Sequence, residues 1–418
     1  MDRDRDDSSV RTVAIAVTAG VFLGGLATGV AFPTLPLLDQ YLGISAAMLG
    51  IILSANRIAR LGMNTPAGGI IDSIGPRRPM IVGLFVQGLA PFGYIAGLYT
   101  PRIEVAVLPA VGSVSAPALV FVLARVFWGL GSAFVFVGAF AIITGVTSQR
   151  NRGRWTGYMR AGQSLGFPTG LVVGGVVADV FDIGTAFLTA GTLALCAGVL
   201  GWYVLPDVQS GESGPGVTRL RDLPSTVRDV PDVLPVGVAN AGVRLLFGGV
   251  LLTTAVKYAA VLDLRAVGLT AAGVSGLVMG IGVVASAGAT VVAGRASDAT
   301  AVRALVTVPA FALLAAGFVT LASFQSLLSV TVGTVLVGAG TGGVGPVLLA
   351  TLGDISPGED VGKLGGIYNV FGDLGLSIGP LVALPAVEQV GYGPTYLASA
   401  AVAVACLLLV SGTLLRKG

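Results

Sequence analysis

Long runs of apolar residues alternate with short polar segments along the whole chain. A helix needs about 20 apolar residues to cross the hydrocarbon core of a bilayer. Runs of about this length or more are expected to form spanning helices at residues 13–37, 44–66, 79–99, 118–146, 157–178, 184–205, 236–260, 268–293, 304–324, 328–352, 364–386 and 393–415. The pattern therefore predicts an all-α membrane protein with twelve transmembrane helices.

Two polar interruptions are longer than the others. Residues 206–235 are rich in Pro, Gly and charge and lie halfway along the chain. They are predicted to be a cytoplasmic linker between an N-terminal six-helix bundle (13–205) and a C-terminal one (236–415). Residues 100–117 are predicted to be a long outside loop, and the charged residues 1–12 a disordered cytoplasmic tail.

The two halves repeat the same glycines at the same spacing. Five glycines recur 209 positions later, namely Gly129, Gly131, Gly157, Gly166 and Gly170 as Gly338, Gly340, Gly366, Gly375 and Gly379. Asp72 recurs as Asp298 at an offset of 226, and the loop at 100–117 absorbs the difference. Repeated halves are typical of secondary transporters, which use them to build a site that opens to either side in turn.

Composition restricts the possible functions. Charged residues make up 11% of the chain, against about 25% in soluble domains. There is no histidine, no phosphate-binding GxxxxGK[ST] loop and no visible catalytic triad or metal cluster. We therefore expect no enzyme activity, cofactor, metal or nucleic-acid partner. Cys196 and Cys406 are expected to be buried packing residues.

The basic residues predict the orientation. Sixteen Lys and Arg residues fall in the tail and in the loops assigned inside, whereas the outside loops hold only Arg102 and Arg265. By the positive-inside rule, both termini are cytoplasmic, and the chain is expected in the cell membrane.

The segment Gly68–Arg78 is the most polar short loop in the first third of the chain. Gly75 and Pro76 are predicted to stop the second helix. Arg77 and Arg78 mark the cytoplasmic face, and Asp72 can pair with an Arg or cap a neighbouring helix.

Charged residues inside the predicted helices are candidates for function, since each costs about 2.5–3.5 kcal/mol to insert. Arg125, Arg57, Arg244 and Asp373 are the candidates for substrate binding or proton coupling. The alternatives are a static ion pair for Arg125 or Asp373 and a polar seam for Arg57. Small residues are expected at close helix contacts, namely Gly129, Gly131, Gly162, Gly166, Gly170, Gly379 and Pro380.

These motifs resemble those of the major facilitator superfamily. Its signature Gly-x-x-x-Asp-x-x-Gly-x-Arg-[Lys/Arg] is filled by Gly68, Asp72, Gly75, Arg77 and Arg78. Its buried-Arg motif is matched by Arg125, Gly129 and Gly131, whereas Leu171 replaces the proline of its antiporter signature. The resemblance implies two bundles rocking about a central cavity lined by helices 1, 4, 7 and 10, with helices 3, 6, 9 and 12 facing lipid and Asp72 in a cytoplasmic latch.

Three functions fit this sequence. The first is a secondary transporter that exports varied small molecules, coupled to protons. The second is a carrier of an anionic metabolite, suggested by the excess of buried Arg. The third is a membrane sensor or scaffold that transports nothing. A stabilising carboxylated or phosphorylated ligand would favour the second, and a partner on the 206–235 linker without any flux would favour the third.

Overall fold

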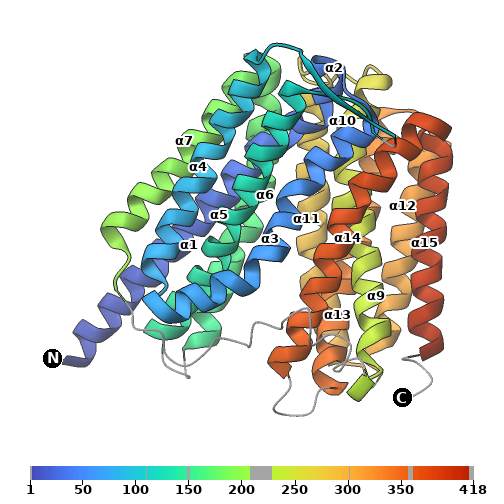
Figure 1. Ribbon diagram of the computed structural model, residues 1–418. Helices are drawn as coiled ribbons and strands as arrows, with labels where there is room; N and C mark the ends of the chain where they lie inside the picture. The colour runs from blue at the N-terminus through green and yellow to red at the C-terminus, as the bar shows by residue number, and fades with distance from the viewer. Residues whose placement is uncertain are drawn as a thin grey trace. The chain divides into compact units, whose positions relative to one another are not determined.

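The computed structural model describes residues 2–109, 111–147, 151–207, 228–300, 302–355 and 361–413. Within these residues, twelve helical spans are long and apolar enough to cross a membrane, which confirms the predicted fold class (Figure 1). Ten spans are single helices: α3 (Ala46–Ile74), α4 (Arg77–Tyr99), α5 (Ala116–Val146), α6 (Arg152–Val180), α7 (Ile183–Val204), α11 (Ala271–Asp298), α12 (Thr307–Ser323), α13 (Leu327–Ile355), α14 (Val361–Val390) and α15 (Tyr392–Thr413).

Two spans change their helical winding along their length. The first consists of α1 (Asp2–Ala31), the 3-10 helix η1 (Phe32–Leu37) and α2 (Leu38–Leu42). The seventh consists of α9 (Val233–Arg244), the π-helix η3 (Leu245–Leu251) and α10 (Leu252–Val261). A short 3-10 helix, η4 (Arg303–Val306), precedes α12. These changes of winding were not predicted, because hydrophobic periodicity does not distinguish them from a regular helix.

The chain forms two compact units. The first unit comprises Met1–Ile44 and Ala55–Val217, and the second comprises Ser45–Ser54 and Thr218–Gly418. The boundary at Val217 falls in the predicted linker 206–235, of which residues 208–227 lie outside the described residues. The clustering of Ser45–Ser54, which includes the start of α3, with the second unit was not predicted.

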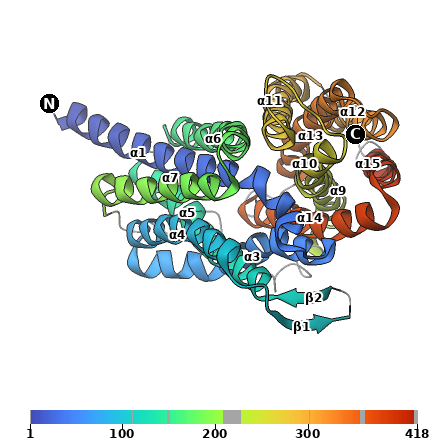
Figure 2. The same cartoon turned by 90° about the horizontal axis from the view of Figure 1, so that it is seen from above.

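The same helix pairs form in each unit. In the first unit α1 packs on α6, and α4 packs on both α5 and α7 (Figure 2). In the second unit α9 packs on α14, and α12 packs on both α13 and α15. Spans 1, 3, 4, 5 and 6 thus find the same partners as spans 7, 9, 10, 11 and 12. The pairing agrees with the repeat of glycines along the sequence.

Asp182 fixes the start of α7. Asp182 caps α7, because its carboxylate accepts hydrogen bonds from the backbone N–H and the hydroxyl of Thr185, at 2.8 and 2.9 Å. The backbone bond, and then the hydroxyl bond, lower the pKa of Asp182. At the N-terminus α1 begins at Asp2, within the segment 1–12 for which a tail was expected.

The predicted outside loop at 100–117 contains an antiparallel hairpin. Strand β1 (Glu104–Leu108) pairs with β2 (Gly112–Ser115), and the Ser113 hydroxyl donates to Glu104 Oε2 at 2.7 Å (Figure 2). The Arg102 guanidinium donates to the carbonyl oxygen of Tyr41 and so holds the start of this segment against the end of the first span. Alternating small and branched residues carry the strand signal, which the prediction of a loop overlooked.

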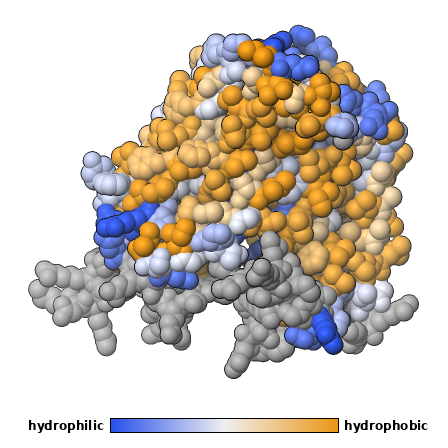
Figure 3. Space-filling model, in the orientation of Figure 1, coloured by the Kyte–Doolittle hydropathy of each residue, from blue (hydrophilic) through white to orange (hydrophobic). Residues whose placement is uncertain are grey.

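Exposed apolar side chains cover the flanks of the helices. Figure 3 shows these residues over much of the visible face, with hydrophilic residues gathered toward the helix ends. The four helices expected to face lipid, α4, α7, α12 and α15, all carry such side chains, for example Val82, Val199, Val319 and Leu408. Cys196 is also exposed on α7, so only Cys406 is the buried packing residue that was predicted.

Candidate functional site

Arg125 is a buried cation in the first third of α5. Its side chain lies in the first unit and is 4% exposed. Its Nη2 donates to Asn56 Oδ1 of α3 at 2.7 Å. The buried hydroxyl of Tyr94, on α4, lies close to the guanidinium. Asn56 of α3 thus bonds the guanidinium directly, and Tyr94 of α4 lies beside it.

Gly129 stands four residues after Arg125, at a position where packing allows no side chain. Positions four apart lie on one helix face, and a Cβ atom added to Gly129 would overlap the carbonyl oxygen of Asn56. The missing side chain therefore lets α3 approach α5 closely, which brings the short Asn56 side chain within reach of Arg125. Gly131 works on another face of α5, where an added Cβ would lie 2.7 Å from the carbonyl oxygen of Gly83 on α4.

The second unit repeats this packing without the charge. A Cβ atom on Gly338, the counterpart of Gly129, would overlap the carbonyl oxygen of Gly282, which stands 226 positions after Asn56. Thr334 stands where Arg125 does, and it is fully buried with its hydroxyl lacking a hydrogen bond. The helix contact is therefore duplicated, whereas the Arg–Asn pair occurs only in the first unit among the described residues.

A second duplicated contact joins the first and fifth helices of each unit. Cβ atoms on Gly166 and Gly170 of α6 would overlap the carbonyl oxygens of Phe22 and Leu26 on α1. Gly162 lies one turn earlier, and its added Cβ would be 2.9 Å from the Thr18 side chain. These three glycines form the close face of α6.

The counterpart contact in the second unit contains one additional residue. Gly375 meets the carbonyl oxygen of Ala241, and Gly379 meets Gly249. In the first unit the two contact residues of α1, Phe22 and Gly29, are seven positions apart. In the second unit the equivalent residues, Ala241 and Gly249, are eight positions apart. The extra position is wound into η3, since a π-turn holds one residue more than an α-turn.

Arg244 is the last residue before η3. Its Nε would lie 3.2 Å from a Cβ atom on Gly372, and the neighbouring Asn240 Nδ2 donates to the carbonyl oxygen of Tyr368 at 2.7 Å. The glycine therefore opens a place on α14 for both polar side chains. Asp373 follows Gly372 and is half-buried, and its backbone carbonyl accepts the Ser377 hydroxyl at 2.7 Å. Arg244 thus packs on α14 at Gly372, the residue that precedes Asp373.

The segment Gly68–Arg78 is mostly helical, so its interpretation as a loop is wrong. Helix α3 continues to Ile74 and α4 begins at Arg77, which leaves only Gly75 and Pro76 between them. Gly75 has a φ of +83°, a conformation that favours glycine, and its N–H donates to the Ile71 carbonyl. Gly68 is buried in the last turns of α3, and Arg78 is exposed at the start of α4.

Arg77 makes its hydrogen bonds within the first unit. It donates to Asp207 Oδ2 at 2.9 Å and to the Trp202 carbonyl at 3.1 Å, so it closes the C-terminal end of α7. Asp72 is exposed on the last turn of α3 and makes no hydrogen bond or ion pair with the described residues. Asp207 was missed because its pairing with Arg77 spans 130 positions.

The corresponding charges in the second unit are tied together. Arg303, 226 positions after Arg77, contacts Asp298 at 3.3 Å and Asp354 at 3.1 Å. Asp298 is the counterpart of Asp72. A carboxylate at this position is therefore engaged within its own unit in the second half and not in the first.

The remaining candidates occupy α3 and α14. Arg57 is half-buried next to Asn56, and the Arg60 guanidinium lies 5.6 Å from the centre of the Phe136 ring. Pro380 packs within the second unit, where a Cβ atom on Gly50 would lie 2.8 Å from its carbonyl oxygen. In the part of the chain that the structure describes, no cluster of three or more His, Cys, Asp or Glu residues could hold a metal ion.

Two six-helix units that repeat their packing, with a buried cation in one of them, define a class of integral membrane proteins. The chain belongs to the Major Facilitator Superfamily, whose family model matches residues 17–282 and 245–417. It is 25% identical over 202 residues to Multidrug resistance protein 2 of Bacillus subtilis (strain 168), covering 48% of this chain and 46% of that protein. It is 24% identical over 187 residues to Quinolone resistance protein NorA of Staphylococcus aureus (strain MRSA252), covering 45% and 43%.

The matched region thus spans less than half the length of these curated relatives. Solved structures extend the likeness in fold to nearly the whole chain. A bacterial homologue of the human lysosomal transporter Spinster superposes with a TM-score of 0.78 at 13% identity, over 98% of both chains. A D-xylose-proton symporter superposes with a TM-score of 0.75 at 18% identity, over 97% of this chain and 98% of that one.

Proposed function

We propose that this protein is a secondary transporter that exports small molecules by alternating access, coupled to protons. The observation that carries the proposal is the duplicated packing with an unduplicated charge: Gly129 and Gly338 make the same contact, but only the first unit adds the Arg125–Asn56 pair. A buried cation is costly to insert, and in membrane proteins it usually marks a transport pathway. The curated relatives, described as multidrug and quinolone resistance proteins, support export.

In this proposal the arginines and Asp373 have different roles in transport. Arg57, Arg125 and Arg244 are the cations that contact polar or anionic groups of the substrate. Asp373, the half-buried carboxylate of α14, is the residue to which we assign the coupling step. The cell membrane is the expected location, with both termini in the cytoplasm, as the distribution of Lys and Arg indicates.

The second candidate function is transport of an anionic metabolite. It is favoured by the group that Arg244 forms with Asn240 and Tyr368, since a guanidinium beside an amide and a phenol suits a carboxylate or phosphate. It requires the same fold and the same conformational cycle, so only the substrate distinguishes it from the first.

Flux into proteoliposomes separates these functions. Purified protein is reconstituted in vesicles with an imposed pH gradient, and uptake of a fluorescent quinolone, a lipophilic cation and a dicarboxylate is followed. Quinolone or cation uptake that collapses with the pH gradient is the expected result. Uptake of the dicarboxylate alone would replace the first candidate by the second. No flux of any solute would contradict both and leave a sensor or scaffold.

Neutralising Asp72 tests the proposed cytoplasmic latch. We expect Asp72→Asn to insert and fold normally, because the carboxylate is exposed and has no partner among the described residues. Its transport rate should fall about tenfold, the effect of losing one charge-assisted hydrogen bond in the transport cycle. The control is Asp263→Asn, which removes an exposed ion pair with Arg265. Equal rates for the two variants would contradict the latch.

A further inference from the structure

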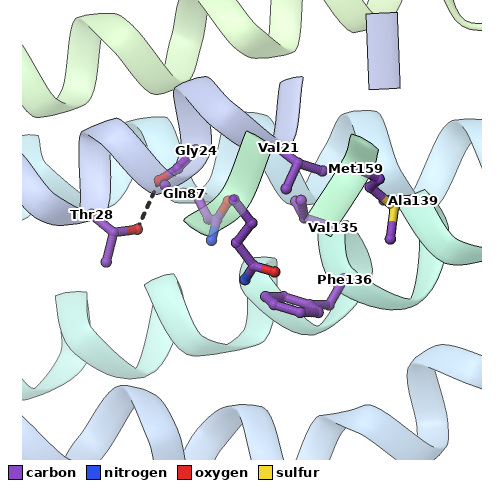
Figure 4. A pocket seen from close by; sticks show the side chains of 10 residues that line it. Val21, Gly24, Thr28, Gln87, Val135, Phe136, Ala139 and Met159 are labelled. Atoms are coloured by element: carbon purple, nitrogen blue, oxygen red, sulfur yellow. Dashed lines mark hydrogen bonds between the residues drawn. The ribbon is translucent and has the colours of Figure 1, made fainter. Parts of the chain in front are cut away.

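We propose that a cavity inside the first unit binds an uncharged hydrogen-bonding group of the substrate, an amide or a hydroxyl, with Gln87 as its anchor. The proposal rests on the transport function and adds the chemical class of one part of the substrate. The cavity has a volume of about 70 Å³ and lies among α1, α4, α5 and α6 (Figure 4). Its lining residues are Val21, Gly24, Gly25, Thr28, Gln87, Val135, Phe136, Ala139, Met159 and Gln163.

Gln87 is the unusual member of this lining. It lies in the apolar helix α4 and is 6% exposed, yet its Oε1 has no hydrogen-bond partner. Buried amide oxygens are nearly always paired, because the loss of water is otherwise not compensated. A Cβ atom on Gly24 would lie 3.8 Å from this oxygen, so the glycine of α1 leaves the space in front of it open. The structure therefore presents an acceptor to an empty volume.

Thr28 and Gln163 are the other polar side chains that line the cavity. Figure 4 shows Thr28 and Gly24 beside Gln87, with the Thr28 hydroxyl donating to the Gly24 carbonyl at 2.8 Å. This bond uses the hydroxyl proton and leaves the Thr28 oxygen as an acceptor. Gln163, half-buried on α6, adds a second carboxamide to the lining. A guest in the cavity therefore meets both donors and acceptors.

The apolar wall and the lack of ionisable lining residues determine which chemical class the cavity can bind. Val21, Val135, Ala139 and Met159 form this wall (Figure 4), and none of the lining residues is ionisable. A charged group would lose its hydration without gaining a counter-charge from any of the lining residues. The cavity therefore suits a neutral group that carries both a donor and an acceptor, attached to an apolar body.

The volume and the rim agree with this class. One water molecule takes about 30 Å³ in the liquid, so the cavity accommodates a carboxamide or a hydroxyl with its attached carbon. Phe136 is the most exposed large side chain of the lining, at 45%, and Arg60 lies over its ring. An aromatic body attached to the neutral group can pack against Phe136 while the group itself reaches Gln87.

Benzamide and benzoate form a matched pair of probes, nearly equal in shape and different in charge. The thermal unfolding midpoint of the full chain in lipid nanodiscs is measured with each probe. We expect benzamide to raise the midpoint by about 2 °C at a concentration of about ten times its Kd, and benzoate to leave it unchanged. An equal rise with benzoate would overturn the assignment to an uncharged group.

Three variants test the anchor. Gln87→Leu should abolish the shift caused by benzamide and leave the ligand-free midpoint unchanged or higher, because it removes an unpaired buried amide. Gly24→Ala places a methyl group before Gln87 Oε1 without obstructing the helix and should reduce the shift. Gln389→Leu, on an exposed glutamine of α14, is the control and should keep the shift.

The opposite results overturn the site. A lower ligand-free midpoint for Gln87→Leu, with the benzamide shift retained, would show that Gln87 only supports buried water. Binding is measured without transport, so the two proposals fail separately. Quinolone flux without a benzamide shift removes the cavity site alone, and a benzamide shift without any flux removes the transport function alone.

Discussion

Replacing Arg125 by methionine is expected to reduce transport by about 10- to 100-fold, the range that corresponds to a hydrogen bond made by a charged group. The guanidinium is buried and bonded to Asn56, so its removal takes the central charge from the first unit. Methionine fills a similar volume but leaves Asn56 Oδ1 without this donor, so the variant should also lose about 1–3 kcal/mol of stability. Initial rates of quinolone uptake, normalised to inserted protein, measure the effect.

Two further variants make the result specific. Arg125→Lys keeps the charge but loses the planar donor group, and it should retain an intermediate rate. Arg160→Met removes an exposed arginine of α6 and should transport at the normal rate. Full activity of Arg125→Met would show that the buried charge is only structural, and the functional reading of its missing counterpart at Thr334 would fail with it.

Adding one methyl group at Gly170 is expected to have the largest effect on stability. A Cβ atom there would overlap the Leu26 carbonyl and lie 2.7 Å from the Gly29 Cα, and neither backbone atom can rotate away. Overpacking of this kind costs about 1–3 kcal/mol and occasionally more. Gly170→Ala should therefore lower the unfolding midpoint by several degrees and reduce the yield of monodisperse protein.

Gly157 provides the matched control on the same helix. Nothing lies within 4 Å of its added Cβ, so Gly157→Ala should stabilise α6 by about 0.5–1 kcal/mol through helix propensity. The two substitutions differ only in position, and their midpoints should move in opposite directions. A lower midpoint for both variants would mean that glycine is needed along α6 for a reason other than the approach of α1.

The twelve spans and the repeat could be predicted because each depends on a signal within the sequence itself. An apolar run of about 20 residues is long enough to span a bilayer. Glycines that recur at one offset in the two halves indicate the same helix contact in each. The end of α3 could not be predicted as well, because Gly68 and Asp72 are read as loop residues although the helix continues to Ile74. The stop at Gly75 was correctly placed, since a positive φ favours glycine.

Partners across helices were the main omission. Arg125 was recognisable as a buried charge, but its partner Asn56 lies 69 positions away, and only the approach at Gly129 brings the two together. Gln87 gave no signal at all, because one glutamine in an apolar run resembles any tolerated polar residue. Its importance comes from an unpaired oxygen facing a cavity, which is a property of four helices together.

The π-helix η3 has a consequence for how the two halves diverged. In a regular α-helix, one inserted residue would rotate everything beyond it by about 100°. Because η3 absorbs the extra residue within Leu245–Leu251, Thr254 still reaches the Tyr396 hydroxyl at 3.0 Å, and Gly249 still faces Gly379. A chimera carrying two copies of the first half would lack this phase correction, so the contacts of Gly249 and Thr254 could not be rebuilt by copying the first span residue for residue.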